Sequence, residues 1–225
     1  MYRVRFYKFV LLLSFSGFVY GEEVASFSRV ISQGSAEVVA TPSHVEFVFV
    51  KIGEGITAEE ALNALQDFDT KLRLRFTEES PRPVEINSSG PFILFKDKFT
   101  AEFRVSILFS LSGIISVTDS QKLFAKLWDK MRQVASEYSL VLKGPYLKVQ
   151  NKETVEKSTV SMAIEKAYPL AEGSATALRG TIYAVDKIEI KELKWLHSGE
   201  NSDEPVSLTE VKCRAEVLVT YLISE

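Results

Sequence analysis

A run of alternating residues from Phe99 to Leu111 constrains the fold more than any other part of the chain. Its odd-numbered positions are all apolar, and its even-numbered positions are all polar except Leu108. Because successive side chains of a β-strand point to opposite faces, this pattern predicts a long strand with one buried face and one wetter face. The sheet that contains this strand needs a covering layer on its apolar side.

A helix with clear N-terminal signals precedes this strand. Thr57 and Glu60 have the spacing of a capping box, and Ile56 is placed to pack against Ala61 as a hydrophobic staple. Apolar residues then recur at helical period as far as Phe76, so we predict one continuous helix with a core-facing side. Such a helix can supply part of the covering layer.

Shorter elements are predicted on both sides of the long strand. Residues 84–87 predict a short strand, and the Ser-Ser-Gly-Pro sequence at 88–91 predicts the turn that leads into the long strand. A second amphipathic helix begins near residues 118–120 and is predicted to end at Gly144-Pro145. A further short strand follows at 146–149.

The segment 31–52 completes a familiar order of elements. It is rich in Val and Phe and predicts two strand segments with a bend at Thr41-Pro42, because proline cannot donate to a sheet ladder. The order across residues 31–150 is then β-α-β-β-α-β, that of a ferredoxin-like or split βαβ unit.

The C-terminal third predicts one helix and two strands. The helix covers residues 152–178, and Pro169 is expected to kink or break it near Lys166, since proline removes one backbone hydrogen bond. Strands are predicted at 181–195 and 206–223, joined by a polar loop. The predicted inner face of the helix consists of Val155, Thr159, Met162, Ala163, Ala167, Leu170 and Ala171.

These elements indicate an α+β fold class, in which a βαββαβ-like two-layer sheet-and-helix unit is extended by a C-terminal α-β-β segment. The chain has no internal repeat and no long linker. We therefore expect a single domain over residues 34–225, preceded by an N-terminal leader at 22–33.

The first 21 residues have the layout of a cleaved secretory signal peptide. Three basic residues come first, an apolar run covers residues 9–19, and Val19 and Gly21 place small residues before a cut at Glu22. A membrane anchor needs about 20 apolar residues, and this run is about half as long. We expect export, no transmembrane segment after cleavage, and a periplasmic, cell-envelope or secreted location.

Charge and cysteine content narrow the classes of partner. The full chain has 27 basic and 30 acidic residues, and cleavage after residue 21 leaves 24 and 30, a net charge of −6. This balance argues against nucleic acid and against docking by charge onto anionic lipid. Cys213 is the only cysteine, so no intrachain disulfide can form, and its alternating surroundings predict a buried thiol.

No residue pattern predicts a catalytic, cofactor or metal site. His44, His197 and Cys213 are too few for a zinc motif, and residues 200–204 lack the spacing of a calcium loop. The chain has no G-x-S-x-G nucleophile motif. The segment from Gly53 to Ala58 fits a dinucleotide-binding pattern, but nearby glutamates would repel a phosphate, and a capped helix start explains it better.

Four segments of the chain resemble the SIMPL-domain family. Residues 34–42 are similar to its opening G-x-a-x-v-x-x-x-P strand, and residues 57–62 are similar to the start of its first helix. The alanines between 163 and 171 and the segment 183–189 are similar to its late alanine-rich helix and the strand after it. The resemblance covers residues 34–222, and its motifs are small residues at structural positions.

The resemblance implies a mostly bacterial and periplasmic envelope protein to which no catalytic residues are attributed. The family includes an immunogenic periplasmic or outer-membrane-associated protein that builds a ring-like, channel-shaped homo-oligomer. Other members are linked to oxidative-stress tolerance, and animal relatives to signalling adaptors. We therefore expect a non-enzymatic, SIMPL-like envelope protein that acts through self-assembly or by binding an envelope partner.

The strands at 36–50 and 99–111 are candidate contact elements for this assembly, because exposed strand edges recruit other strands. The helix at 152–178 is a second candidate. Two other functions stay open: an exported hydrolase that uses His44 or His197 as a general base, and a lipid or small-ligand carrier. The residues that would line the carrier site are Phe92, Phe95, Phe103 and Phe109.

The capping box generates a first prediction. Thr57→Ala should lower the free energy of unfolding by about 1 kcal/mol, because an orphan backbone N–H at the helix start loses its acceptor. Urea denaturation followed by circular dichroism measures the change. A free energy of unfolding that is unchanged within error would contradict this placement of the helix start.

Overall fold

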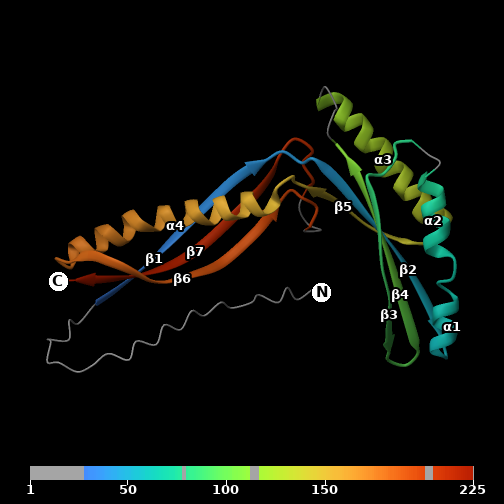
Figure 1. Ribbon diagram of the computed structural model, residues 1–225, viewed down its shortest axis with the longest axis horizontal. Coiled ribbons are helices and arrows are strands. Elements are labelled where there is room, and N and C mark those ends of the chain that lie inside the picture. The colour runs from blue at the N-terminus through green and yellow to red at the C-terminus, as the bar shows by residue number, and fades with distance from the viewer. Residues whose placement is uncertain (1–27, 78–79, 112–116, 201–204, 225) are drawn as a thin grey trace.

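The computed structural model describes residues 28–77, 80–111, 117–200 and 205–224. In this part of the chain, seven strands form two antiparallel sheets, and helices cover one face of each sheet. Figure 1 shows two lobes that meet at an angle, which gives the molecule a bent, elongated shape. The predicted α+β class is confirmed.

The predicted secretory signal at 1–21 lies outside the described residues, as does the leader as far as residue 27. Among the helices that the structure describes, none has the length and apolar character needed to cross a membrane.

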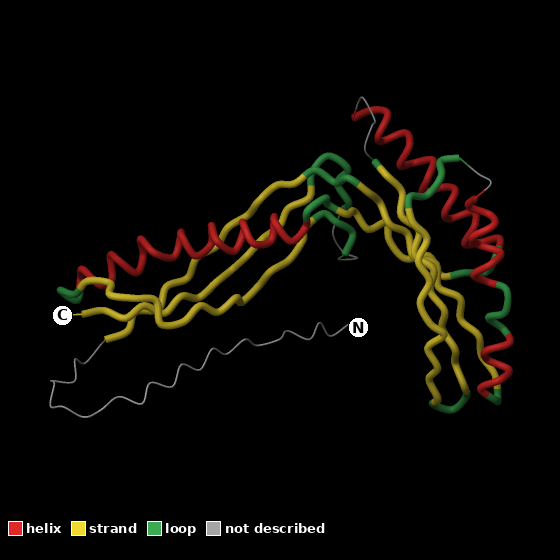
Figure 2. The backbone as a smooth tube through the Cα atoms, in the orientation of Figure 1, coloured by secondary structure: helices red, strands yellow, loops and turns green. Residues whose placement is uncertain are grey.

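The three-stranded lobe contains both ends of the described chain. It consists of β1 (Ser28–Ala40), β7 (Val211–Ser224) and β6 (Thr181–Leu196), with β7 in the centre and antiparallel to both neighbours. Helix α4 (Lys152–Ala177) lies along one face of this sheet, as Figure 2 shows. β1 begins earlier than the predicted start at Ile31 and pairs with β7 along its whole length.

The four-stranded lobe has the predicted β-α-β-β-α-β order, with the first helix divided into two. Its elements are β2 (His44–Gly55), α1 (Ala58–Asn63), α2 (Phe68–Thr77), β3 (Glu85–Phe95), β4 (Phe99–Ser110), α3 (Val117–Glu137) and β5 (Val141–Lys148). The sheet order is β3-β4-β2-β5, and every pair is antiparallel. The unit starts at β2, because the bend predicted at Thr41-Pro42 carries the chain from one sheet into the other.

The main apolar core lies in the four-stranded lobe and continues into the other one. The core side of β4 follows the predicted alternation, with Ala101, Val105, Ile107 and Phe109 buried. The Phe109 ring meets the rings of Phe47 and Phe76 edge-on, with 6.3 Å between centroids in both cases. Trp195 and Cys213, from the junction ends of β6 and β7, belong to the same cluster. One core therefore joins the two lobes.

The first helical segment departs from its prediction after a confirmed start. Thr57 Oγ1 accepts the Glu60 N–H at 3.2 Å, and the Glu60 carboxylate accepts the Thr57 N–H at 3.3 Å. The helix then breaks between α1 and α2, where Asp67 has a positive φ of 60°. Ile56 is 86% exposed, so the predicted staple against Ala61 is wrong.

A predicted turn and a predicted helix end both lie inside strands. Residues 88–91 belong to β3, whose pairing with β4 shifts register there, and Gly90 has a φ of +110°. The hairpin turn comes later, at residues 96–98. Gly144-Pro145 lies inside β5 at a second register shift, while α3 already ends at Glu137. A Gly-Pro pair therefore makes a bulge here, because proline leaves one ladder hydrogen bond unmade without ending the strand.

Helix α4 is continuous across Pro169, so the predicted break near Lys166 is wrong. Its buried positions recur every four residues and are all small: Thr159, Ala163, Ala167, Ala171 and Ala175. Met162 and Leu170, which were predicted on the inner face, are 38% and 64% exposed. The inner face is therefore a narrow stripe of small side chains.

This stripe lets α4 lie almost in backbone contact with β1. A Cβ atom on Gly34 would lie 1.9 Å from the carbonyl oxygen of Ala163 and 2.8 Å from the nitrogen of Ala167. Beside it, the Ser32 hydroxyl donates to the carbonyl oxygen of Ala167 at 2.7 Å. The helix therefore lies over β1 and β7, and it leaves much of β6 uncovered.

Gly34→Ala should destabilise the fold by about 3 kcal/mol, because the added methyl group overlaps the helix backbone, which cannot move aside as a side chain would. Gly173→Ala is the matched control, since a Cβ atom there meets nothing within 4 Å and the position lies inside α4. The control should be neutral or stabilising by up to about 1 kcal/mol. Urea denaturation measures both, and equal stability of the two variants would contradict the close approach.

Candidate functional site

The two histidines lie at strand ends and make local contacts. His44 starts β2, and its Nδ1 lies 2.9 Å from the hydroxyl of the preceding Ser43. His197 follows β6, and its Nδ1 lies 3.2 Å from the carbonyl oxygen of Pro205 across the loop. Within the described residues, no group of three or more His, Cys, Asp or Glu side chains is arranged to hold a metal ion.

Cys213 is a core residue, as predicted. Its side chain is fully buried opposite Trp195 in the β6–β7 ladder. Burial raises the pKa of the Cys213 thiol, although a hydrogen bond with Thr159 acts in the opposite direction. The thiol is therefore held in its protonated, unreactive form.

The glycines of the Gly53-Glu54-Gly55 segment serve packing. A Cβ atom on Gly53 would lie 2.2 Å from the carbonyl oxygen of Ala61, and one on Gly55 would lie 2.5 Å from the Cβ of Glu60. The first turn of α1 therefore rests directly on the end of β2. This arrangement accounts for the pattern without a bound nucleotide.

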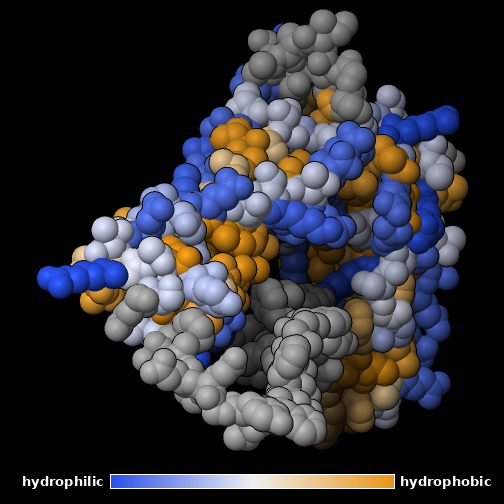
Figure 3. Space-filling view, turned by 60° about the vertical axis from the view of Figure 1, so that its left-hand side comes forward, coloured by the Kyte–Doolittle hydropathy of each residue, from blue (hydrophilic) through white to orange (hydrophobic). Residues whose placement is uncertain are grey.

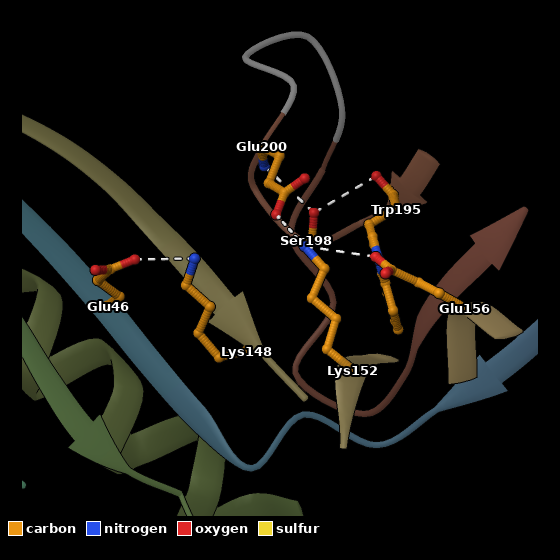
Figure 4. Close-up of polar contacts among 7 residues, drawn as sticks. All are labelled: Glu46, Lys148, Lys152, Glu156, Trp195, Ser198 and Glu200. Atoms are coloured by element: carbon orange, nitrogen blue, oxygen red, sulfur yellow. Dashed lines mark hydrogen bonds and ion pairs between the residues drawn. The ribbon is translucent and has the colours of Figure 1, made fainter. Parts of the chain in front are cut away.

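A polar network stands at the junction of the two lobes (Figure 4). The indole N–H of Trp195 donates to Glu156 at 2.8 Å, and the Lys152 ammonium lies 3.9 Å from Glu156 and 3.4 Å from Glu200. The backbone N–H of Glu200 points to the Ser198 hydroxyl at 3.4 Å. The network ties the first turn of α4 to the end of β6 and to the loop beyond it.

The other lobe is joined to the same loop by its edge strand. The backbone N–H of Leu147 in β5 donates to the carbonyl oxygen of Ser198 at 2.7 Å. Next to it, Lys148 pairs with Glu46 of β2 at 2.9 Å (Figure 4). Each carboxylate of the junction shown in Figure 4 has a lysine partner, which fits a structural joint.

An apolar groove runs between α4 and β6, and we call it the α4–β6 groove. Its apolar lining consists of Val160, Ile164, Ile190 and Leu193, and its volume is about 450 Å³. Ile190 and Leu193 pair with Val217 and Ala215 of β7, so they share the face that α4 covers elsewhere. Ile190 is nevertheless 49% exposed, because α4 does not reach it. On the face that Figure 3 shows, apolar patches lie among polar ones.

The charged side chains that line this groove are paired within the chain. Lys157 pairs with Glu153 at 2.7 Å, and Glu156 lies 3.9 Å from the Lys152 ammonium. Hydrogen bonding to Lys157 holds the pKa of Glu153 below its usual value. Each charged side chain of the lining therefore has a partner of opposite charge, which leaves little to attract a highly charged partner.

A second apolar surface projects from the other lobe, and we call it the β3 edge segment. It consists of Phe92, Ile93, Leu94 and Phe95, whose exposed fractions are 51%, 49%, 57% and 61%. β3 is an edge strand, so the outer side of its backbone has no neighbouring strand within the described sheet. Side chains on both faces of this strand are exposed, which is unusual for four consecutive large apolar residues.

These surfaces differ from the contact strands predicted from sequence. Residues 44–50 of the first predicted segment and 99–110 of the second fall in β2 and β4, which are paired on both sides, so they offer no free edge. Only residues 36–40, in β1, lie at an edge. The exposed face of β6 is not evident from the sequence. Three register shifts in the pairing of β6 with β7 interrupt the alternation of apolar and polar residues that would have marked this face.

The residues proposed for a carrier site do not form one. Phe109 is fully buried in the core, whereas Phe92 and Phe95 face solvent from β3. The Phe95 ring packs on Phe99 with 4.7 Å between centroids. Buried and exposed rings in this arrangement do not enclose a common cavity.

No protein-family model and no curated protein matches the chain. The resemblance to the SIMPL-domain family therefore rests on the sequence segments quoted above, and the function has to be argued from the surfaces of the molecule.

The environment of Cys213 predicts a pH dependence of stability. Above the ordinary thiol pKa of 9.0, the unfolded chain ionises while the folded thiol stays protonated, so the free energy of unfolding should fall as pH rises. Cys213→Ala should lack this part of the decline. Urea denaturation at pH 7.5, 8.5 and 9.5 compares the two chains, and parallel pH profiles would contradict the prediction.

Proposed function

We propose that this chain is an exported, non-enzymatic, SIMPL-like cell-envelope protein that acts by self-assembly. In this proposal, the β3 edge segment of one copy occupies the α4–β6 groove of the next copy. The observation that carries it is the presence, on opposite lobes of one chain, of a concave apolar groove and a projecting apolar strand.

The chemistry of the two surfaces favours a second copy as the occupant. The charged side chains that line the groove are paired within the chain, so strongly charged partners gain little there, and burial of apolar side chains has to drive binding. The β3 edge segment supplies such side chains and is itself uncharged from Phe92 to Phe95. Covering both surfaces removes exposed apolar area on each copy.

The geometry of this contact predicts the type of assembly. The groove and the β3 edge segment are different surfaces, so the contact is heterologous and each copy keeps one free surface of each kind. Heterologous contacts build closed rings when the rotation between copies closes and filaments when it does not. A ring agrees with the assembly that the family resemblance implies.

Export and the absence of catalysis rest on separate observations. The layout of residues 1–21 supports export. The junction carboxylates are engaged with lysines, and the one thiol is buried, which supports a role in binding.

The test measures the mass of residues 22–225 by size-exclusion chromatography with light scattering. The parent chain should form an assembly of several copies. Ile190→Asp in the groove and Ile93→Asp in the β3 edge segment should each weaken it at least tenfold, because a carboxylate would be buried against apolar side chains. Leu74→Asp is the matched control, since Leu74 is 59% exposed on α2, outside both surfaces, and it should change nothing.

Mixing the two variants gives the sharper result. Ile190→Asp retains an intact β3 edge segment and Ile93→Asp retains an intact groove, so together they should form a one-to-one dimer that neither forms alone. A monomeric parent chain would overturn the proposal. So would a lipid bound in the groove of a monomer, seen by native mass spectrometry, which would favour a carrier.

A further inference from the structure

β1 presents the most regular free edge among the described strands. Its 13 residues pair with β7 without a register shift, and its other side has no neighbouring strand within the described sheets. The other three edge strands, β3, β5 and β6, each contain at least one register shift. Such irregularities hinder the addition of a further strand, so β1 is the edge best suited to accept one.

A pocket of about 250 Å³ lies near the middle of this edge. It is lined by Ser35, Ala36 and Glu37 of β1, by Lys166 of α4 and by Arg214 of β7. Lys166 belongs to the helix that covers one face of the sheet. Arg214 stands opposite Glu37 in the ladder, at an exposed position of β7 whose buried neighbours face that helix. The two cations therefore reach the β1 edge from opposite faces of the sheet.

The pocket carries an excess of positive charge. Neither the Lys166 ammonium nor the Arg214 guanidinium makes an ion pair with a residue that the structure describes. Glu37 is the one carboxylate of the lining, and it pairs with Lys212 at 3.1 Å. Glu216, the next carboxylate along this face, accepts a hydrogen bond from an amide side chain of β1. Three cations thus stand beside two carboxylates, and two of the cations have no counter-ion.

The flank of α4 at this edge presents side chains with a repeat that suits an added strand. Met162 and Leu170 lie one helical turn on either side of Lys166, so the three follow one another about 6 Å apart. Alternate side chains on one face of a β-strand are about 6.8 Å apart. Both Met162 and Leu170 are exposed. A strand beside β1 can therefore place an apolar, an acidic and an apolar side chain against these three residues.

We propose that the β1 edge binds an extended acidic segment of a partner protein by strand addition. The backbone of the segment hydrogen-bonds to the free edge of β1. One acidic side chain pairs with Lys166 and the next one with Arg214, because consecutive side chains of a strand point to opposite faces. Apolar side chains two residues before and after the first acidic residue pack on Met162 and Leu170.

The charges favour this occupant over a second copy of the chain. A copy that paired through its own β1 would bring another Lys166 and another Arg214 to the same edge, where like charges repel. The edge is also separate from the surfaces proposed for self-assembly, since no residue of the pocket belongs to the α4–β6 groove or to the β3 edge segment.

The test titrates the mature chain, residues 22–225, into a fluorescein-labelled peptide and follows fluorescence anisotropy. The peptide Thr-Val-Thr-Glu-Glu-Val-Thr has the proposed arrangement of apolar and acidic side chains and should bind saturably. The same peptide with Gln at both Glu positions should bind at least about fivefold more weakly. A peptide with Lys at both positions should not bind.

Methylation of the peptide backbone distinguishes strand addition from attraction by charge. One peptide carries a methyl group on the backbone nitrogen of its first Glu, and a second peptide carries it on the next Glu. Only one of these two N–H groups points toward β1, because hydrogen bonds to one neighbouring strand come from alternate residues. One methylated peptide should therefore lose binding and the other should keep it.

Two double variants of the protein test the cations. Lys166→Ala with Arg214→Ala should weaken binding about tenfold, since each exposed ion pair contributes about threefold and separate contributions add. Lys126→Ala with Arg132→Ala is the matched control, because it removes the same charges from exposed positions of α3. The control should leave binding within about twofold, since only screened long-range attraction is lost.

Four outcomes would overturn the proposal. Three are the absence of saturable binding, an equal effect of the two methyl groups, and an equal loss of affinity in the two double variants. The fourth comes from light scattering with saturating peptide, which should leave the number of copies in the assembly unchanged. A smaller assembly would show that another copy occupies this edge. Because the edge and the assembly surfaces share no residues, failure of strand addition leaves the proposal of self-assembly standing.

Discussion

The close approach of α4 to β1 is the contact on which the rest of the three-stranded lobe depends. Gly34 gives the helix backbone room to lie against the strand, and the small buried residues of α4 keep that distance along its length. A helix held so near one edge of a narrow sheet cannot also cover the opposite edge. The uncovered face of β6, and with it the α4–β6 groove, follows from this contact rather than from any property of β6 alone.

The two lobes are joined by more than the chain that connects them. Trp195 and Cys213 extend the apolar core across the junction, and Lys152 with its two glutamates lies beside them. Apolar packing and polar contacts therefore both hold the angle between the two lobes. The distance between the α4–β6 groove and the β3 edge segment is set by this joint.

Local signals predicted the elements better than their partners. The alternation in 99–111 and the capping box at Thr57 are properties of neighbouring residues, and both are present. The prediction of a turn at Gly90-Pro91 and of a stop at Gly144-Pro145 was wrong. The same dipeptide occurs in turns and in bulges, and only cross-strand pairing decides between them. The pairing of β1 with the last strand and the flank of α4 left exposed also depend on contacts between distant residues, which periodicity does not encode.

The entry and exit of the four-stranded lobe lie side by side. The backbone N–H of Ser43 donates to the carbonyl oxygen of Lys148 at 2.9 Å, so residues 44–148 leave and rejoin the three-stranded lobe at nearly one point. The four-stranded lobe is therefore an insertion between β1 and α4 of the three-stranded lobe. On the ribosome, β1 emerges first but has no sheet to join until β7 is made. The inserted lobe is therefore complete before the three-stranded sheet can form on its own N-terminal strand.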